Sequence, residues 1–366
     1  MIASAFGGEA DLKWLGRKLP LMTLSGRSSH NKSWPVMLCE PHATTPIVVT
    51  AMKKVLLFLV PILLVTVACQ SMPKETFQFT GPVSQLRIMT FNVWESGSRV
   101  HDGRNKIVAA IRASGADVVT MQESGGAAGF VARTLGWYSY QPSRSVAIVS
   151  RYPIMDTYGP THNHAGAGAR IMLNDEPRQE IVAWSVYLSS RPYAPLQACL
   201  EGAETEDILA GQARNQLRDI SSILAALAAH VSDADKTPVF LAGDLNTPSH
   251  LDWSPAAAEL HCGYAVPYPV TQKIEAAGLT DAYRQVSPDP VADPANTWSP
   301  IYETYVYPIG TPEPMDRIDM IFFTPASAQV TDANTFVIGE PAQSPDHKGN
   351  QWPSDHKAVI ADFVLK

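Results

Sequence analysis

Three apolar segments of this chain each end on a carboxylate or an amide. The segments are 86–92, 117–123 and 238–244, and they close on Asn92, Glu123 and Asp244. The first alternates as a β-strand does, and the other two are runs of mostly apolar residues typical of buried strands. Strand ends and the loops after them are where protein scaffolds usually carry their chemistry. The pattern therefore predicts a β-rich core with a polar site at the ends of its strands.

Further polar groups follow the same rule toward the C-terminus. Asn246 lies two residues after Asp244, Asp319 opens another apolar run, and Asp355 and His356 precede the last one. Carboxylate oxygens suit a hard cation, amides can orient phosphate and water, and an imidazole can exchange a proton. The set thus indicates metal-assisted attack of water on a phosphate ester.

Length and composition fit one globular domain. The chain has 366 residues, of which 45% are hydrophobic and 17% charged, as in an ordinary folded protein. Strand-like and helix-like segments alternate without the regular repeat of a doubly wound sheet. We therefore expect an α/β fold, a four-layer sandwich of two packed mixed β-sheets flanked by helices. The expected helices are 105–114, 205–230 and 271–277, and the further strands are 145–150, 169–173, 180–188, 318–324 and 358–364.

The N-terminal part of the chain has the features of an export signal. Two lysines precede the apolar run 55–68, which ends before Cys69. A spanning helix needs about 20 apolar residues, so this run is too short, and Pro61 interrupts it. The residues around Cys69 resemble a bacterial lipobox, with Thr66 where leucine is more common. We expect a lipoprotein-type signal peptide, with a plain signal peptide as the alternative.

This signal sets the expected division of the chain. The expected parts are a non-native, disordered extension (1–51), the signal peptide (52–69), a polar linker (70–85) and the catalytic domain (86–366). A lipid on Cys69 would tether the mature protein to the membrane. We expect an exported, membrane-anchored bacterial protein of the cell envelope, on the periplasmic or extracellular face, and a monomer.

The net charge argues against nucleic acid as the substrate. The part before Cys69 holds 7 of the 28 Lys and Arg residues and 3 of the 35 Asp and Glu residues, so 21 basic and 32 acidic residues remain, a net charge of about −11. Proteins that grip duplex phosphates without sequence preference are usually basic. A small phosphate ester or a lipid headgroup is therefore favoured.

Cys199 and Cys262 remain as a pair in the mature chain. In an oxidising, exported setting such a pair predicts a disulfide, and the alternative is two buried free thiols. The bridge would join the loops 191–199 and 249–262, which follow strands of the expected site. These loops are therefore candidates for setting substrate specificity.

Five short motifs, in order, resemble one family of enzymes. They are Thr90-Phe91-Asn92-Val93-Trp94, Met121-Gln122-Glu123-Ser124, Ala242-Gly243-Asp244-Leu245-Asn246, Asp316-Arg317-Ile318-Asp319-Met320 and Ser354-Asp355-His356. Each motif alone is weak, but five in this order are similar to the endonuclease/exonuclease/phosphatase superfamily of deoxyribonuclease-like, metal-dependent phosphoesterases. The resemblance covers nearly all of 86–366 and implies a hydrolase that uses one or two Mg²⁺ or Mn²⁺ ions.

The resemblance also implies roles for these residues. Glu123 is the expected metal ligand, with Asp355 and with Asn92, which holds either the metal site or the scissile phosphate. Asp244 would orient or deprotonate the attacking water, and Asn246 would stabilise a phosphate oxygen. Since Asp244 and Asn246 stand two residues apart, we expect their side chains on the same side of an extended segment. Without the resemblance, the glutamate would be a solvated strand end and the asparagines would be turn residues.

His356 is expected to act as a proton donor or as a cationic contact for the phosphate. A carboxylate hydrogen-bonded to one ring nitrogen fixes the tautomer of a histidine and raises its pKa. The family pattern gives that orienting role to Asp319. Arg317 is expected to form a structural ion pair instead of contacting the substrate.

Tyr187 departs from part of the family pattern. Phosphodiesterases and sphingomyelinases of this group often carry histidine before leucine where this chain has Tyr187 and Leu188. Abasic-site endonucleases carry a tyrosine there, so we expect the phenol to contact the phosphate, unless it is only a half-buried strand residue. The leading hypothesis is a phosphodiesterase or phosphatase acting on a small molecule or a lipid headgroup. The alternatives are an extracellular nuclease and a catalytically silent binding protein.

Overall fold

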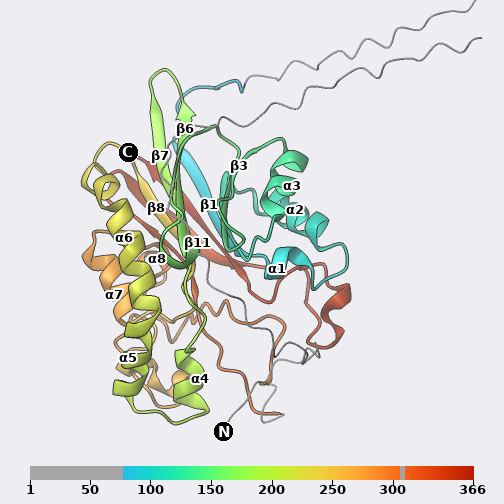
Figure 1. Ribbon diagram of the computed structural model, residues 1–366, viewed down its shortest axis with the longest axis vertical. Helices are drawn as coiled ribbons and strands as arrows, with labels where there is room; N and C mark the ends of the chain where they lie inside the picture. Colours follow the sequence, from blue (N-terminus) through green and yellow to red (C-terminus); the bar gives the residue numbers. More distant parts are fainter. Residues whose placement is uncertain (1–76, 306–309) are drawn as a thin grey trace, which may run out of the picture. The chain divides into compact units, whose positions relative to one another are not determined.

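The computed structural model describes residues 77–305 and 310–366, and these fold into two six-stranded sheets with helices outside them (Figure 1). The first sheet has the order β11 (Ala328–Phe336), β12 (Ala358–Leu365), β1 (Gln85–Asn92), β2 (Val118–Gln122), β4 (Val146–Ser150), β3 (Tyr138–Tyr140). The second has the order β5 (Ile154–Tyr158), β6 (Gly166–Asn174), β7 (Gln179–Tyr187), β8 (Val239–Asp244), β10 (Asp319–Phe323), β9 (Thr280–Asp281). Both sheets are mixed, because β1–β2 and β7–β8 run parallel and their other pairings are antiparallel. The expected four-layer sandwich of two packed mixed sheets is confirmed.

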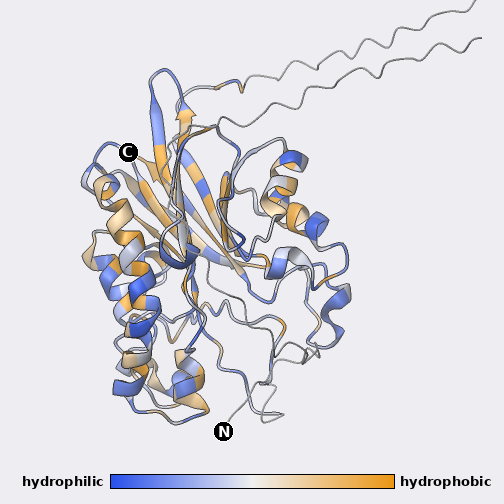
Figure 2. Ribbon diagram, viewed as in Figure 1, coloured by the Kyte–Doolittle hydropathy of each residue, from blue (hydrophilic) through white to orange (hydrophobic). Residues whose placement is uncertain are grey.

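The central strands of each sheet are buried on both faces, whereas the edge strands β3, β5 and β11 are partly exposed. In β1, Leu86 and Ile88 pack into the cluster between the sheets, while Met89 and Phe91 pack toward the helices of the first sheet. Successive side chains of a strand point to opposite faces, so the even-numbered residues of β1 face the second sheet. Figure 2 shows the strands dominated by hydrophobic residues and the helices carrying both kinds. This arrangement explains the continuous apolar runs in the sequence.

Helices cover the outer face of each sheet. The first sheet is covered by α2 (Gly103–Ser114) and α3 (Ala127–Leu135), and the second by α6 (Gln216–Ser232) and α7 (Pro269–Ala276), on the left in Figure 1. The shorter helices are α1 (Trp94–Gly97), α4 (Ala194–Cys199), α5 (Thr205–Arg214), α8 (Ala282–Val286), η1 (His162–His164), η2 (Pro255–His261) and η3 (Asp346–Gly349). Among the residues described, no helix is long and apolar enough to cross a lipid bilayer.

The single helix expected over 205–230 is wrong, because the structure has two helices there. They are separated at Asn215, whose φ of −122° and ψ of −81° are not helical. The Asn215 side chain donates a hydrogen bond from Nδ2 to the carbonyl of Arg191, 2.8 Å away. Asparagine readily exchanges helical bonds for such local contacts, and this ends α5.

The folded part of the chain begins before residue 86. The ring of Phe77 lies 6.3 Å from that of Tyr138 and 5.9 Å from that of Tyr152, and Val83 exchanges two hydrogen bonds with the side chain of Gln179. The second half of the expected linker therefore packs on the sheets. The expected extension, the signal peptide and Cys69 lie outside the described residues, and their assignment stays a prediction.

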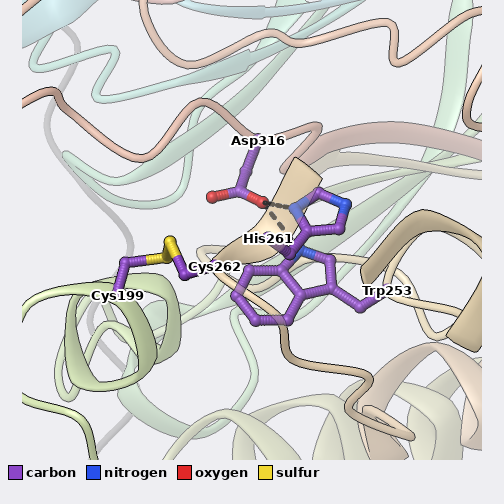
Figure 3. The surroundings of a disulfide bond; sticks show 5 residues. All are labelled: Cys199, Trp253, His261, Cys262 and Asp316. Carbon is purple, nitrogen blue, oxygen red and sulfur yellow. Dashed lines mark hydrogen bonds and ion pairs between the residues drawn. A yellow bond between two sulfur atoms is a disulfide. The ribbon is translucent and has the colours of Figure 1, made fainter. Parts of the chain in front are cut away.

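The expected disulfide is present. Cys199 at the end of α4 is bonded to Cys262, directly after η2 (Figure 3). Beside it, Trp253 stacks on His261 with ring centroids 4.5 Å apart, and the indole Nε1 donates to Asp316 Oδ1 at 2.7 Å. The bridge thus fixes the two loops that flank this buried carboxylate.

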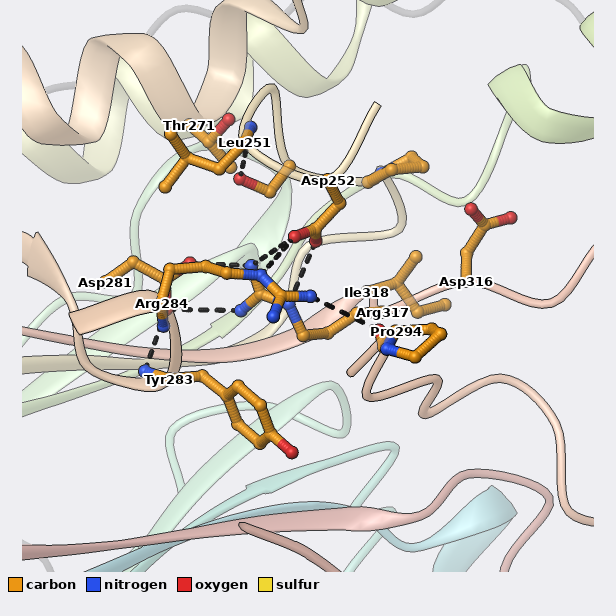
Figure 4. Close-up of polar contacts among 12 residues, drawn as sticks. Leu251, Asp252, Thr271, Asp281, Tyr283, Arg284, Pro294, Asp316, Arg317 and Ile318 are labelled. Atoms are coloured by element: carbon orange, nitrogen blue, oxygen red, sulfur yellow. Dashed lines mark hydrogen bonds and ion pairs between the residues drawn. The ribbon is translucent and has the colours of Figure 1, made fainter. Parts of the chain in front are cut away.

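A buried network of ion pairs ties the loops of the second sheet together (Figure 4). Arg317 contacts Asp252 at 2.9 Å and Asp281 at 2.7 Å, and Arg284 contacts Asp252 at 2.6 Å. All four side chains are buried. The expectation that Arg317 forms a structural ion pair is confirmed.

Replacing Arg317 should destabilise the domain strongly. In Arg317→Met, Asp281 loses its guanidinium partner and Asp252 keeps only Arg284, which leaves buried negative charge uncompensated. We expect the free energy of unfolding to fall by about 3–5 kcal/mol in urea titrations. Arg178→Met, which removes an exposed arginine from its pair with Glu180, should cost less than about 1 kcal/mol. Equal losses in the two variants would contradict a stabilising role for the buried network.

Candidate active site

The two sheets bring their polar residues together at one end of the space between them. Pairing of β7 with β8 places Tyr187 opposite Asp244, and pairing of β8 with β10 places Asp319 opposite Asp244. Asn92 ends β1 of the facing sheet and continues the series of residues that point inward. Four of the expected site residues thus come from four strands of two sheets.

A direct hydrogen bond joins the sheets at this point. Asn92 Nδ2 donates to Asp244 Oδ2 at 3.0 Å, and Asn92 Oδ1 accepts from the backbone N–H of Trp94 at 3.0 Å. The same Nδ2 atom lies 3.5 Å from His356 Nε2. Asn92, Asp244 and His356 are all buried. The structure therefore brings together three groups that are far apart in the sequence.

His356 is held in one orientation by contacts on several sides. Its Nδ1 lies 2.8 Å from Asp319 Oδ2, and its backbone N–H donates to Ser354 Oγ at 3.0 Å. Ser354 Oγ in turn donates to the carbonyl of Asn92 at 2.6 Å, and the ring of Trp298 lies 5.0 Å from the imidazole. The expected Asp319–His356 pair is present, with Nε2 directed toward Asp244 at 3.9 Å.

The protonation states of His356, Asp244 and Asp319 depend on one another. Burial tends to lower the pKa of His356, but the charges of Asp319 and Asp244 outweigh it and raise the pKa well above its ordinary value. Burial, together with the charge of Asp319, raises the pKa of Asp244 to about 7. Ligand atoms of Asp244, Asp319 and His356 lie within 4.8 Å of one another, close enough to hold a cation. Since His356 is already hydrogen-bonded to Asp319, we interpret the imidazolium itself as the cation between these carboxylates.

Glu123 lies directly after β2 in a strained backbone conformation. Its φ is 51°, in the left-handed region, which costs a residue with a side chain about 1–2 kcal/mol. Its Oε1 accepts from the Tyr187 hydroxyl at 2.9 Å, and its Oε2 accepts from the backbone N–H of Glu95 at 2.9 Å. Trp94, Glu95 and Ser96 also have positive φ. Such strain is concentrated at functional sites, where the surrounding structure maintains it.

Asp355 supplies a second buried carboxylate near Glu123. Burial raises the pKa of Asp355 to about 7; His356 lowers it, and the charge of Glu123 raises it. Within the residues described, no other residue donates a hydrogen bond to this carboxylate. Two acidic groups that repel each other, together with the amide oxygen of Asn92 at the same end of the sandwich, form a donor set that fits a hard divalent cation. Glu123, Asp355 and Asn92 could therefore hold the expected metal ion.

Tyr187 contacts the glutamate. Burial and the charge of Glu123 raise the pKa of Tyr187, so the phenol stays protonated and donates to Glu123 Oε1. Its expected contact with a phosphate stays a prediction.

The expected extended segment at Asp244 and Asn246 is wrong. Strand β8 ends at Asp244, and Asn246 has a φ of 49°, in the left-handed region. The backbone N–H of Asn246 donates to Asp244 Oδ1 at 2.8 Å, and its Nδ2 donates to the carbonyl of Leu188 at 2.9 Å. Asparagine tolerates this conformation, and an aspartate side chain often accepts from the N–H two residues on. The motif is thus a turn that fixes the Asp244 carboxylate.

Two cavities have Tyr187 in their lining. The larger, about 910 Å³, is lined by Glu123 and by residues of α1, α2 and the loop before β4, including Arg104 and Arg144. The smaller, about 390 Å³, shares Ser145 and Tyr187 with it and is also lined by Asn163, Ser189 and Asp219. Of the loop residues expected to set specificity, Arg191 lines the smaller cavity, whereas Tyr193 lines neither cavity and its hydroxyl is buried. Sequence reasoning missed Ser145, Arg104 and Arg144, which belong to no motif.

The chain is similar to one enzyme family and to several known proteins. The model of the endonuclease/exonuclease/phosphatase family matches residues 89–356. An uncharacterized protein of Caenorhabditis elegans is 31% identical over 295 residues, which is 76% of this chain and 91% of that protein. The crystal structure of TDP2 from C. elegans is similar over 76% of this chain and 75% of that chain, with 14% identity and a TM-score of 0.50. An endonuclease/exonuclease/phosphatase of Beutenbergia cavernae matches over 77% of this chain and 72% of that chain, with 20% identity and a TM-score of 0.47.

At 14% identity the structure of C. elegans TDP2 indicates the fold alone. The match to the family model supports more than the fold. It extends from the middle of β1 to His356 and includes all the residues that meet at the ends of the strands. The chain therefore belongs to the endonuclease/exonuclease/phosphatase family, whose members are divalent-metal-dependent hydrolases of phosphoester bonds.

Proposed function

We propose that this protein is a Mg²⁺- or Mn²⁺-dependent phosphodiesterase or phosphatase that hydrolyses a small phosphate ester or a lipid headgroup. One observation carries the proposal: Asn92 contacts both Asp244 and His356, with Asp319 on the far side of the imidazole. A base, a cationic donor and the groups that orient them thus meet at one point. Glu123 and Asp355 supply acidic oxygens beside it.

The metal ion belongs with Glu123, Asp355 and the Oδ1 atom of Asn92. When bound, one or two such ions would withdraw charge from the phosphate oxygens. The hydrogen bonds from Tyr187 and from the Glu95 backbone hold the Glu123 carboxylate in place for this role. An asparagine oxygen that already accepts one hydrogen bond keeps a second lone pair for a ligand.

Asp244 is the base in the proposed reaction. Its pKa of about 7 suits a group that must take a proton from water near neutral pH. The water oxygen bonds to phosphorus, its proton passes to Asp244, and the ester oxygen leaves on the opposite side. Donors from Asn92 and from the Asn246 backbone keep the carboxylate in one position throughout.

His356 completes the proposed site as a cation. With its pKa raised, the imidazolium presents Nε2–H toward the Asp244 side of the site, where it can donate to a phosphate oxygen or to the departing oxygen. Asn246 and Tyr187 are the further expected phosphate contacts.

The location of the protein belongs to the same proposal and rests on the sequence pattern alone. An export signal at 52–69 and a lipid on Cys69 would hold the domain at the membrane of a bacterial cell envelope, as a monomer. Such a tether favours substrates at the membrane surface. The acidic net charge weighs against an extracellular nuclease.

Removing the Glu123 charge should abolish metal-supported turnover. In Glu123→Gln, we expect kcat/KM for bis(p-nitrophenyl) phosphate to fall by at least about 100-fold, with weaker Mg²⁺ binding in calorimetry. Removal of the metal from the wild-type protein with a chelator should lower turnover in the same way, and added Mg²⁺ should restore it. Glu206→Gln, an exposed glutamate of α5, serves as the control. Full activity of Glu123→Gln would contradict the proposed metal site.

Replacing Asp319 should shift the pH dependence of hydrolysis. Protonated His356 is the active form, so activity is lost as the pH rises through its pKa. Asp319→Asn removes a charge that raises this pKa, so the alkaline limb of the kcat/KM profile should move to lower pH by about one unit or more. Asp332→Asn, an exposed aspartate of β11, should leave the limb in place. A lower rate at every pH with an unmoved limb would show that Asp319 acts only on structure.

The acidic net charge of the chain predicts that it hydrolyses small phosphate esters in preference to DNA. At physiological salt, supercoiled plasmid DNA should remain intact under conditions in which bis(p-nitrophenyl) phosphate is hydrolysed. Hydrolysis of sphingomyelin in vesicles, assayed in parallel, tests the lipid-headgroup hypothesis. Rapid nicking of the plasmid would favour the nuclease alternative.

A further inference from the structure

The larger cavity beside Glu123 carries two arginines without acidic partners. Arg104 lies in the first turn of α2, and Arg144 lies in the loop before β4; both side chains are exposed. In the part of the chain that the structure describes, neither forms an ion pair with an aspartate or a glutamate. By contrast, Arg99 nearby is paired with Glu95.

Arg144 lies close to the metal-binding side of the site. A Cβ atom built on Gly125 would lie 3.7 Å from one of its terminal guanidinium nitrogens and only 2.1 Å from Ser96 Oγ. The backbone N–H of Gly125 also donates to the carbonyl of Arg144 at 2.8 Å. The guanidinium is therefore near the backbone two residues after Glu123, where Ser96 Oγ leaves no room for a Cβ atom.

The acidic groups that line the cavity form no ion pair with these arginines in the described part of the chain, although they keep their charge. Glu95 is paired with Arg99, and Asp102 accepts from the side chain of Asn105 at 2.7 Å. Glu123 accepts from Tyr187 and is the proposed metal ligand. Arg104 and Arg144 therefore remain as positive groups in a concave site, in an otherwise acidic chain. A guanidinium group that forms no ion pair can bind an anion directly.

We propose that this cavity binds a second phosphoryl group of the substrate, with Arg144 and Arg104 as its binding residues. The substrate class is then a small phosphate ester that carries a further phosphate beside the one that is hydrolysed. This inference rests on the proposed function, which puts the scissile phosphate between Glu123 and His356. Arginine suits the task because its planar guanidinium donates two parallel hydrogen bonds to phosphate oxygens. A cavity of about 910 Å³ has room for such a group.

A matched pair of substrates isolates the second phosphate. Thymidine 5′-(p-nitrophenyl phosphate) and its 3′-phosphorylated form differ in that group alone. The wild-type protein should hydrolyse the 3′-phosphorylated form with the higher kcat/KM. Arg144→Ala and Arg104→Ala should each lower kcat/KM for this form by about tenfold and leave the other form within about twofold. Arg133→Ala, an exposed arginine of α3 outside both cavities, is the matched control.

Binding measured without turnover separates this proposal from the proposed function. Thymidine 3′,5′-bisphosphate should bind the wild-type protein about tenfold more tightly than either arginine variant in calorimetry. If neither chromogenic ester is hydrolysed but this difference in binding holds, the proposed function fails and the phosphate site stands. Equal hydrolysis of both esters, with no effect of either substitution on rate or binding, would overturn the site.

The same chemistry could come from adjacent phosphates of a nucleic acid strand. A short thymidine oligonucleotide tests this source under the same conditions. The small-ester assignment predicts that the oligonucleotide is the poorer substrate in kcat/KM. A clear preference for the oligonucleotide, lost in Arg144→Ala, would reject the small ester in favour of a strand.

Discussion

The hydrogen bond from Asn92 to Asp244 is the contact on which the rest of the site depends. It joins the last residue of β1 to the last residue of β8, 152 positions apart in the chain, across the space between the two sheets. Both residues occupy positions at which a strand points toward the other sheet, so the packing of the sheets dictates that they meet. The apolar contacts below them, such as Ile88, Phe240 and Phe363, fix that packing. The packing that stabilises the core therefore also sets the geometry of the site.

The end of the sandwich concentrates more negative charge than its own cations balance. Asp244, Asp319 and Asp355 are buried and Glu123 is adjacent. Among the described residues, His356 is the one basic side chain in contact with Asp244 and Asp319. An unpaired buried carboxylate costs several kcal/mol, and the left-handed backbone at Glu123 adds to that cost. Burial raises the pKa values of Asp244 and Asp355, and the charges of Asp319 and of Glu123, respectively, raise them further. A divalent cation beside Glu123 and Asp355 would relieve this imbalance of charge, so the same strain that weakens the isolated domain favours metal binding.

Much of this arrangement could be predicted from the sequence, because polar residues at the ends of apolar segments leave a local signal. Asn92, Glu123 and Asp244 close such segments, Asp319 and His356 precede others, and the order of the motifs adds the resemblance to the family. Strand β11 was missed because it lies at the edge of its sheet and buries only Ala328, Val330 and Ala333, so no apolar run marks it. The break at Asn215 and the turn at Asn246 depend on carbonyls of Arg191 and Leu188, which are distant in sequence. The cavities combine loops that share no motif, and only the folded chain shows that Arg104 and Arg144 line the same space.

The residues proposed to act in the reaction and the residues that line the cavities also differ in how the fold holds them. The groups of the reaction stand at the ends of strands, and each makes hydrogen bonds to neighbours from other elements. The groups that line the cavities come instead from the start of α2 and from loops, and Arg104 and Arg144 are exposed. Loops can change in length and charge without disturbing sheet packing, whereas a change at Asp244 or Asn92 would alter both sheets. The structure therefore separates the hydrolytic chemistry, which the sandwich fixes, from recognition of the ester, which the loops can vary.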